Sequence, residues 1–245
     1  MMARLLALLL LWPLAAQAAP VCDKIDFDGA PFTYCRIDMA KDPLRLWLRD
    51  ETGKPYGSFR NIERALNAEG KTLGVAMNAG MYHADRAPVG LYIEDGDQHM
   101  RVVTADGPGN FGLLPNGVFC ITGASAAVIE SRSFAESPAK CDHATQSGPM
   151  LVIDGALHPR FLAEGTSRYI RNGVGVSADG REVVIAISDR AVNFHQFGRL
   201  FRDAFNTPNA LYLDGNVSRL YAPHLGRNDG GFPMGPILGT VQPMN

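Results

Sequence analysis

Short apolar runs, many of them ending at an Asp-Gly pair, set the strongest limit on how this chain can fold. The pairs are Asp95-Gly96, Asp154-Gly155, Asp179-Gly180 and Asp214-Gly215. Asp-Gly favours tight turns, and short β-rich runs between turns are typical of strands. The expected strands are 44–48, 73–77, 89–93, 118–122, 149–153, 173–177, 182–187 and 210–213. Residues 174–188 are expected to form a hairpin around Asp179-Gly180.

Two other segments have apolar side chains at helical spacing. One runs from Phe59 to Gly70, and the other begins at Phe194, after Asn193, and extends to Ala204. Each places its apolar residues on one helical face, and Gly and Asn are common at helix ends. The sequence therefore predicts an α+β fold, a single β-rich domain with a mixed or antiparallel sheet and a few helices packed on it.

The N-terminus has the features of an export signal. Arg4 precedes an apolar run over 5–14, and Ala16-Gln17-Ala18 matches the small-residue pattern of a cleavage site. We expect residues 1–18 to be a cleaved signal peptide and 19–245 to be the functional domain. No other segment approaches the roughly 18 apolar residues of a membrane span. The prediction is a periplasmic or secreted protein with no stable membrane span after cleavage.

The four cysteines fit an oxidising compartment. They are Cys22, Cys35, Cys120 and Cys141. An even count in an exported chain favours disulfides, and four cysteines allow three pairings. The sequential pairing closes the shortest loops and is the one we favour. The spacing matches no zinc site, because it lacks C-x-x-C and a nearby H-x-x-x-H.

Charge and motif content exclude several classes of function. The chain has 23 basic and 25 acidic side chains and no block of five like charges, whereas nucleic-acid binding requires clustered Lys and Arg. We therefore expect no nucleic-acid partner. G-x-S-x-G, H-E-x-x-H and Walker-type phosphate loops are also absent from the sequence.

Polar residues beside glycines at strand ends are the candidates for chemistry. The first group follows the expected strand 73–77: Asn78 can donate to a sugar hydroxyl or phosphate oxygen, Gly80 can expose backbone N–H groups, and His83 can contact a sugar. The second group is Gln146-Ser147-Gly148, before the expected strand 149–153. Ordinary turns explain both groups equally well without any ligand.

Two charged residues complete this set. Arg171 presents a planar fork that can grip two phosphate oxygens, although surface ion pairing is the more common role of an arginine. Asp214 ends a strand and precedes Gly215 and Ser218, where a carboxylate can act on a ligand or simply form a turn. Weaker candidates for a second carboxylate are Asp85 and Glu94.

Taken in order, four segments resemble the phosphodiester glycosidase family, which includes the N-acetylglucosamine-1-phosphodiester alpha-N-acetylglucosaminidase. They are 78–82, 146–152, 171–175 and 213–218. Segments 116–120, 207–214 and 232–239 also look like a bacterial exported subgroup. Two residues depart from the family pattern, since Ala79 and Asn216 each stand where a glycine is usual. A side chain at each of these positions narrows the expected cleft. The two replacements therefore affect which substrate can bind and whether the protein is active.

The resemblance implies hydrolysis of a sugar–phosphodiester linkage in an envelope or extracellular glycan. Arg171 and Asn78 would contact phosphate, Asp214 would act as base or nucleophile, and Ser218 and Gln146 would position a sugar-phosphate or polysaccharide substrate. Two alternatives stay open. One is a metal-dependent phosphodiesterase, with a divalent cation on Asp214 and Asp85; the other is a non-catalytic protein for polysaccharide binding or envelope assembly. No cofactor is otherwise assigned.

Overall fold

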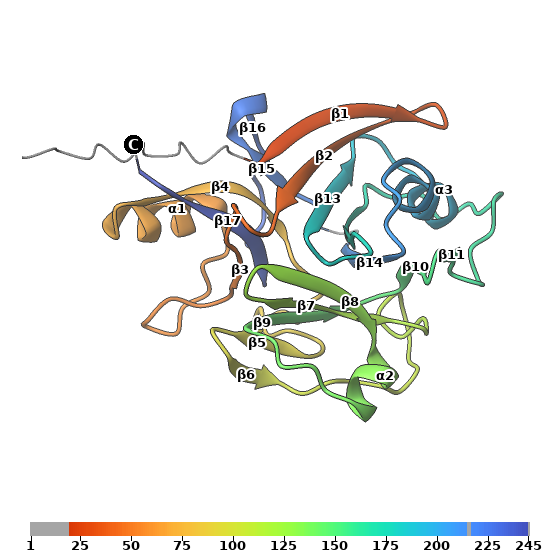
Figure 1. Ribbon diagram of the computed structural model, residues 1–245, viewed down its shortest axis with the longest axis horizontal. Coiled ribbons are helices and arrows are strands. Elements are labelled where there is room, and N and C mark those ends of the chain that lie inside the picture. Colours follow the sequence, from red (N-terminus) through yellow and green to blue (C-terminus); the bar gives the residue numbers. More distant parts are fainter. Residues whose placement is uncertain (1–19, 215–216, 245) are drawn as a thin grey trace, which may run out of the picture.

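The computed structural model describes residues 20–214 and 217–244. Their strands pair antiparallel throughout and form three sheets. The first sheet has the order β1 (Val21–Phe27), β2 (Ala30–Asp38), β13 (Glu182–Ser188), β12 (Asn172–Val176), β14 (Asn209–Asp214), β10 (Met150–Ile153) and β11 (Ala156–Leu157). In Figure 1, β1 and β2 lie at the top of the molecule.

The other two sheets have five strands each. The second has the order β16 (Arg227–Asn228), β15 (Leu220–Ala222), β4 (Lys71–Asn78), β17 (Ile237–Pro243) and β3 (Leu44–Trp47). The third has the order β6 (Asp97–Met100), β5 (Tyr92–Glu94), β9 (His143–Ser147), β7 (Gly117–Thr122) and β8 (Ser125–Glu130), and lies at the bottom of Figure 1.

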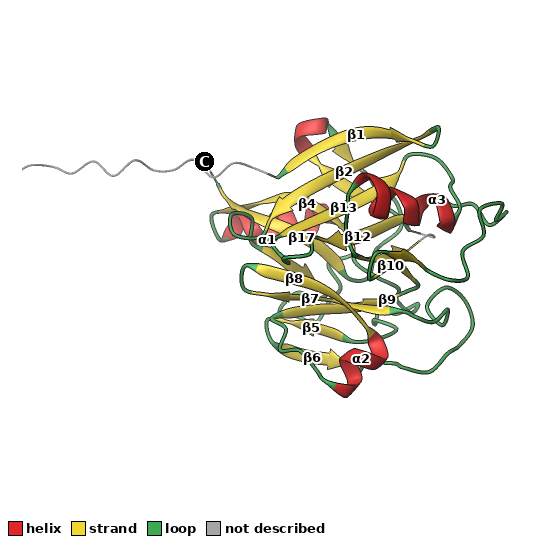
Figure 2. Ribbon diagram, turned by 45° about the vertical axis from the view of Figure 1, so that its right-hand side comes forward, coloured by secondary structure: helices red, strands yellow, loops and turns green. Residues whose placement is uncertain are grey.

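Short helices cover the outer faces of the sheets. The helical segments are α1 (Phe59–Ala68), α2 (Ser131–Glu136), α3 (Phe194–Arg199), a π-helical turn (Leu200–Ala204) and a 3-10 turn (Pro223–Leu225). The side chain of Ser58 caps α1, and Phe59, Ile62 and Leu66 form its buried face. The side chain of Asn193 caps α3 by accepting from the N–H of Gln196 at 2.8 Å. Figure 2 shows α3 lying against the side of the first sheet.

All three sheets contribute to one central hydrophobic core. Ile185 and Leu211 of the first sheet, Met77 of the second and Phe119 of the third are all fully buried in it. Each such side chain contributes about 1.5–3 kcal/mol relative to an exposed position. A second cluster, which includes Phe197 of α3, packs on the outer face of the first sheet. The α+β prediction of one β-rich domain is confirmed, and the sheets are antiparallel.

One predicted strand begins later than expected, and one alternative interpretation of the sequence does not hold, both around Gln146. Residues 89–91 are not a strand, because the N–H of Leu91 bonds to the side-chain Oε1 of Gln146 at 3.1 Å instead of joining a ladder. Gln146 and Ser147 do not form a turn before a strand but end β9, whose residues are all buried. A buried strand that ends in Gln and Ser has no apolar signal in the sequence.

The structure contains two disulfides in sequential order. Cys22–Cys35 joins β1 to β2, and Cys120–Cys141 joins β7 to the segment before β9. Among the described residues, no helix has the length and apolar character that a bilayer crossing requires. The expected signal peptide, 1–18, lies outside the described residues.

Candidate functional site

Strand ends from all three sheets meet in one place. Asn78 ends β4 and Asn172 begins β12, while Asp214 ends β14 and Ser147 ends β9. The Oγ of Ser147 donates to the carbonyl of Leu213 at 2.8 Å, which fastens β9 to β14. These contacts bring together segments that are far apart in the sequence.

A pair of buried amides lies at the centre of this junction. Asn78 and Asn172 are both fully buried. The Nδ2 of Asn172 donates to the backbone carbonyl and the Oδ1 of Asn78, at 3.0 and 2.9 Å. The Oδ1 of Asn172 accepts from the N–H of Asp214 at 3.0 Å, and the Oδ1 of Asn78 accepts from the N–H of Arg219 at 2.9 Å. The pair therefore fixes the backbone at both ends of the segment 214–219.

Asp214 is the carboxylate at this junction. Its exposed fraction is 9%. Burial raises the pKa of Tyr82, and the negative charge of Asp214 raises it further. The Oγ of Ser218 lies within hydrogen-bond distance of the carbonyl oxygens of Asp214 and Ile170, at 2.8 and 3.0 Å. Gly215 lies outside the described residues.

Arg171 lies beside the same junction but is enclosed by protein. It is fully buried, its guanidinium carbon is 3.6 Å from the ring centroid of Phe194, and burial lowers its pKa. Its Nε donates to the carbonyl of Val192 at 3.0 Å and its Nη2 to that of Ser167 at 2.9 Å. Within the described chain, its Nη1 is buried without a hydrogen-bond partner, and no carboxylate forms an ion pair with Arg171.

Tyr212 connects Arg171 to Asp214 electrostatically. Burial raises the pKa of its phenol well above the ordinary value; the guanidinium of Arg171 opposes this rise and the carboxylate of Asp214 adds to it. Both charges therefore lie near enough to act on the same group. The guanidinium carbon of Arg171 lies 5.3 Å from the ring centroid of Tyr212.

Gln146 and Gly148, which were predicted to contact substrate, pack against other parts of the protein. The side-chain amide of Gln146 is fully used by the protein: its Oε1 accepts from the N–H groups of Leu91 and Val103, and its Nε2 donates to Val103, Asn116 and Ser131. Gly148 packs so closely that an added Cβ would lie 2.5 Å from that of Asn116. Both residues support the loop before β7.

The loop after β4 reaches the surface. Gly80 has φ +135°, a conformation that favours glycine, and an added Cβ would lie 3.0 Å from the Oγ1 of Thr145. His83 is exposed, and its N–H donates to the carbonyl of Ala87 at 2.8 Å. Tyr82, which belongs to the family-like segment 78–82 but was not predicted as a site residue, is half-buried.

The weaker carboxylate candidates do not join Asp214. Asp85 is exposed on the loop after His83, where its Oδ1 accepts from the N–H of Ala87. Glu94 lies in the third sheet and accepts from the N–H of Leu48 and the phenol of Tyr92. Across 20–214 and 217–244, no group of three or more His, Cys, Asp or Glu side chains is arranged to hold a metal ion.

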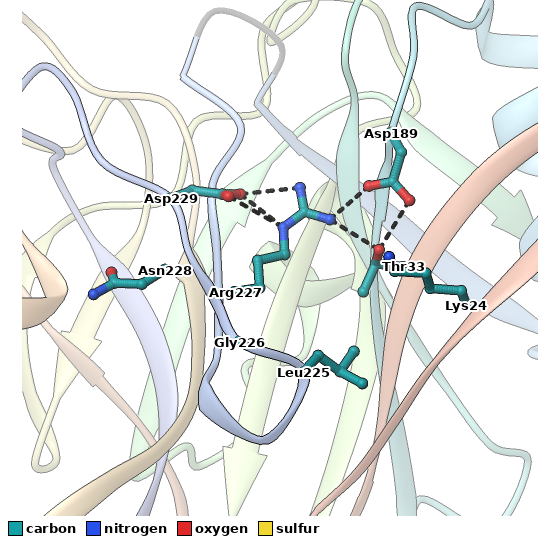
Figure 3. Close-up of a pocket in the computed structure, with 8 residues that line it drawn as sticks. All are labelled: Lys24, Thr33, Asp189, Leu225, Gly226, Arg227, Asn228 and Asp229. Atoms are coloured by element: carbon teal, nitrogen blue, oxygen red, sulfur yellow. Dashed lines mark hydrogen bonds and ion pairs between the residues drawn. The ribbon is translucent and has the colours of Figure 1, made fainter.

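A separate hollow of about 360 Å³ is occupied by paired charges. Arg227 forms ion pairs there with Asp189 and Asp229, and its Nη1 donates to the Oγ1 of Thr33 at 2.8 Å (Figure 3). Asp229 also accepts from the N–H of Leu220 at 2.9 Å, so the cluster secures the start of β15. Because these charges are already paired, we assign the cluster to structural support.

Comparison with known proteins identifies the family. The profile described as "Phosphodiester glycosidase" matches residues 71–232, which include Asn78, Arg171 and Asp214. The chain belongs to the phosphodiester glycosidase family. The uncharacterized protein YigE of Escherichia coli (strain K12) is 34% identical over 218 residues, which cover 89% of this chain and 84% of YigE.

Solved structures share the phosphodiester glycosidase fold at low sequence identity. The auto-inhibited catalytic domain of the zebrafish N-acetylglucosamine-1-phosphodiester alpha-N-acetylglucosaminidase matches with a TM-score of 0.62 and 14% identity. The match covers 90% of this chain and 81% of that one. A putative exported protein from Burkholderia pseudomallei K96243 matches with a TM-score of 0.56 and 12% identity, over 86% and 74% of the two chains. These two matches support the fold.

Proposed function

We propose that the protein hydrolyses the bond between the anomeric carbon of a sugar and the phosphate of a phosphodiester. Membership of the phosphodiester glycosidase family supports this reaction class. The observation that carries the proposal is the placement of Asp214, a nearly buried carboxylate at a junction of three sheets, with the cations Arg171 and Arg219 nearby.

The proposed hydrolysis depends little on protonation of the leaving group. A phosphate monoester leaves as a stable anion, so a strong general acid is less important than in ordinary glycosidases. Asp214 accepts a proton from water as the water oxygen bonds to the anomeric carbon, and the C–O bond electrons leave with the phosphate. Asp214 acting as a nucleophile gives the same products through a covalent sugar intermediate. In both routes the carboxylate must be ionised and firmly positioned.

The surrounding residues position Asp214 in this proposal. The Oδ1 of Asn172 accepts its N–H, the Oδ1 of Asn78 accepts the N–H of Arg219, and the Oγ of Ser218 donates to the carbonyl of Asp214. Arg171 orients Tyr212 by packing over its ring, while its Nε and Nη2 are held by backbone carbonyls. Gly80 and His83, on the loop after β4, are proposed to line the approach of the sugar.

The two disulfides support action outside the cytoplasm, where such bonds persist. We therefore propose that the protein is periplasmic or secreted and that its substrate is part of an envelope or extracellular glycan. A sugar linked through phosphate to a larger group is the substrate class that fits this setting.

A panel of glycosyl-1-phosphodiesters tests the reaction, with the matching phosphate monoesters as controls. We expect release of free sugar and a phosphate monoester, with oxygen-18 from labelled water found in the sugar. Label in the phosphate together with loss of activity in a chelator would instead indicate a metal-dependent phosphodiesterase. Glycan binding without turnover across the panel would indicate a non-catalytic protein.

A further inference from the structure

Arg219 has the open hydrogen-bond donors that Arg171 lacks. Its exposed fraction is 9%, and its Nη1 donates to the carbonyl of Phe232. Its Nε and Nη2 donate to no residue that the structure describes. Within the part of the chain that the structure describes, no carboxylate forms an ion pair with Arg219.

The surroundings of Arg219 hold its guanidinium in one position. Its N–H is fixed by the Oδ1 of Asn78. Gly231, with φ +134°, packs so tightly that an added Cβ would lie 2.4 Å from the Nη2 of Arg219. Gly235 packs in the same way against Tyr82, with an added Cβ 2.5 Å from its ring. The segment 231–235 therefore supports both Arg219 and Tyr82.

The charges of Arg219 and Asp214 both act on the phenol of Tyr82. The pKa of Tyr82 is raised by burial first and by the charge of Asp214 second, and the cations Arg86 and Arg219 oppose that rise. The buried amide pair Asn78–Asn172 binds the N–H groups of both residues, which holds a carboxylate and a guanidinium at one junction. This arrangement suits a substrate that carries a reacting carbon next to an anionic group.

We propose that Arg219 binds the phosphate group of the substrate while Asp214 acts at the adjacent carbon. The Nε and Nη2 donors lie on one side of the planar guanidinium and can grip two phosphate oxygens. Arg171, whose Nε and Nη2 already donate to backbone carbonyls, is a positioning residue in this scheme. The identification of the anion as substrate phosphate rests on the proposed function, whereas anion binding itself does not.

Calorimetric titration with inorganic phosphate tests the binding site directly. Arg219→Met is expected to weaken phosphate binding about tenfold or more, as for the loss of charge-assisted hydrogen bonds. Arg219→Lys keeps the positive charge but loses the two parallel donors of the guanidinium. Its phosphate affinity should lie between those of the unmodified protein and Arg219→Met. Arg64→Met is the matched control, because Arg64 is exposed on α1; its phosphate affinity should equal that of the unmodified protein.

The assignment would be overturned by the absence of phosphate binding to the unmodified protein, or by equal phosphate binding to folded Arg219→Met. Thermal melting confirms that each variant is folded. With an active phosphodiester, Arg219→Met should raise KM more than it lowers kcat; an unchanged KM would also reject the role. If no phosphodiester is hydrolysed but Arg219→Met still loses phosphate binding, the proposed reaction fails and the anion site stands.

Discussion

The Nδ2 of Asn172 donates to both oxygens of Asn78, the backbone carbonyl at 3.0 Å and the Oδ1 at 2.9 Å. This contact joins β12 of the first sheet to β4 of the second. The Oδ1 of Asn172 accepts the N–H of Asp214, and the Oδ1 of Asn78 also accepts the N–H of Arg219. The position of the acidic and basic groups of the site therefore depends on one buried amide pair.

Asn172→Asp should destabilise the protein by about 2–4 kcal/mol, because it removes the donor and places a carboxylate against the oxygens of Asn78 in a buried site. Urea denaturation measures the free energy of unfolding. Asn206→Asp is the control, since Asn206 is exposed, and it should change stability by less than about 0.5 kcal/mol. Equal stability of the two variants would show that the amide pair is not essential to the fold.

Asp214→Asn should lower kcat about 100-fold or more while leaving the protein folded, because the amide cannot accept the proton of water or attack carbon. Steady-state kinetics on an active phosphodiester, with circular dichroism of the variant, makes the measurement. Ser147→Ala provides a comparison, because Ser147 fastens β9 to β14 through its Oγ and should affect stability more than kcat. A fully active Asp214→Asn variant would remove Asp214 from the chemistry.

Removing either disulfide should lower the free energy of unfolding by about 2–4 kcal/mol, since each bond restricts the unfolded chain. The paired substitution of Cys120 and Cys141 by Ser opens a loop with a sequence separation of 21, and that of Cys22 and Cys35 a loop of 13. Denaturation under non-reducing conditions gives both values. A variant pair as stable as the unmodified protein would contradict the expectation.

The sequence predicted those strands that are apolar and bounded by turns. Residues 182–187 and 210–213 are rich in buried aliphatic side chains, and both form strands of the first sheet. β1 escaped prediction because it is an edge strand with mostly exposed or partly exposed residues. β9 escaped prediction because its buried residues are largely polar and are satisfied by distant partners.

Sequence reasoning found the candidate residues but not how they are used. Asn78 and Asn172 are 94 residues apart, and nothing in a single sequence indicates that their amides pair. Arg171 and Arg219 also look alike in the sequence, as basic residues beside short polar motifs. Only the packing shows that Arg171 is enclosed while Arg219 keeps two open donors.

Stability should decrease as the pH falls below about 6.5, the usual pKa of histidine. Burial lowers the pKa of His158, and burial also lowers that of His143, where Asp95 opposes the effect. At acidic pH these histidines therefore bind protons more readily in the unfolded chain than in the folded protein. Their contribution to the free energy of unfolding is complete above the ordinary histidine pKa and is lost as the pH falls below it.

Replacing His158 should reduce this loss of stability at acidic pH. His158 is 1% exposed, stacks on Phe161 and accepts from the N–H of Arg160 at 3.2 Å. His158→Gln is expected to lower the Tm at neutral pH through lost packing, yet to show a smaller further decrease between about pH 7 and pH 5. His195→Gln on α3 is the control and should keep the full pH dependence. If His158→Gln loses as much Tm toward acid as this control does, protonation of His158 is not a source of the acid sensitivity.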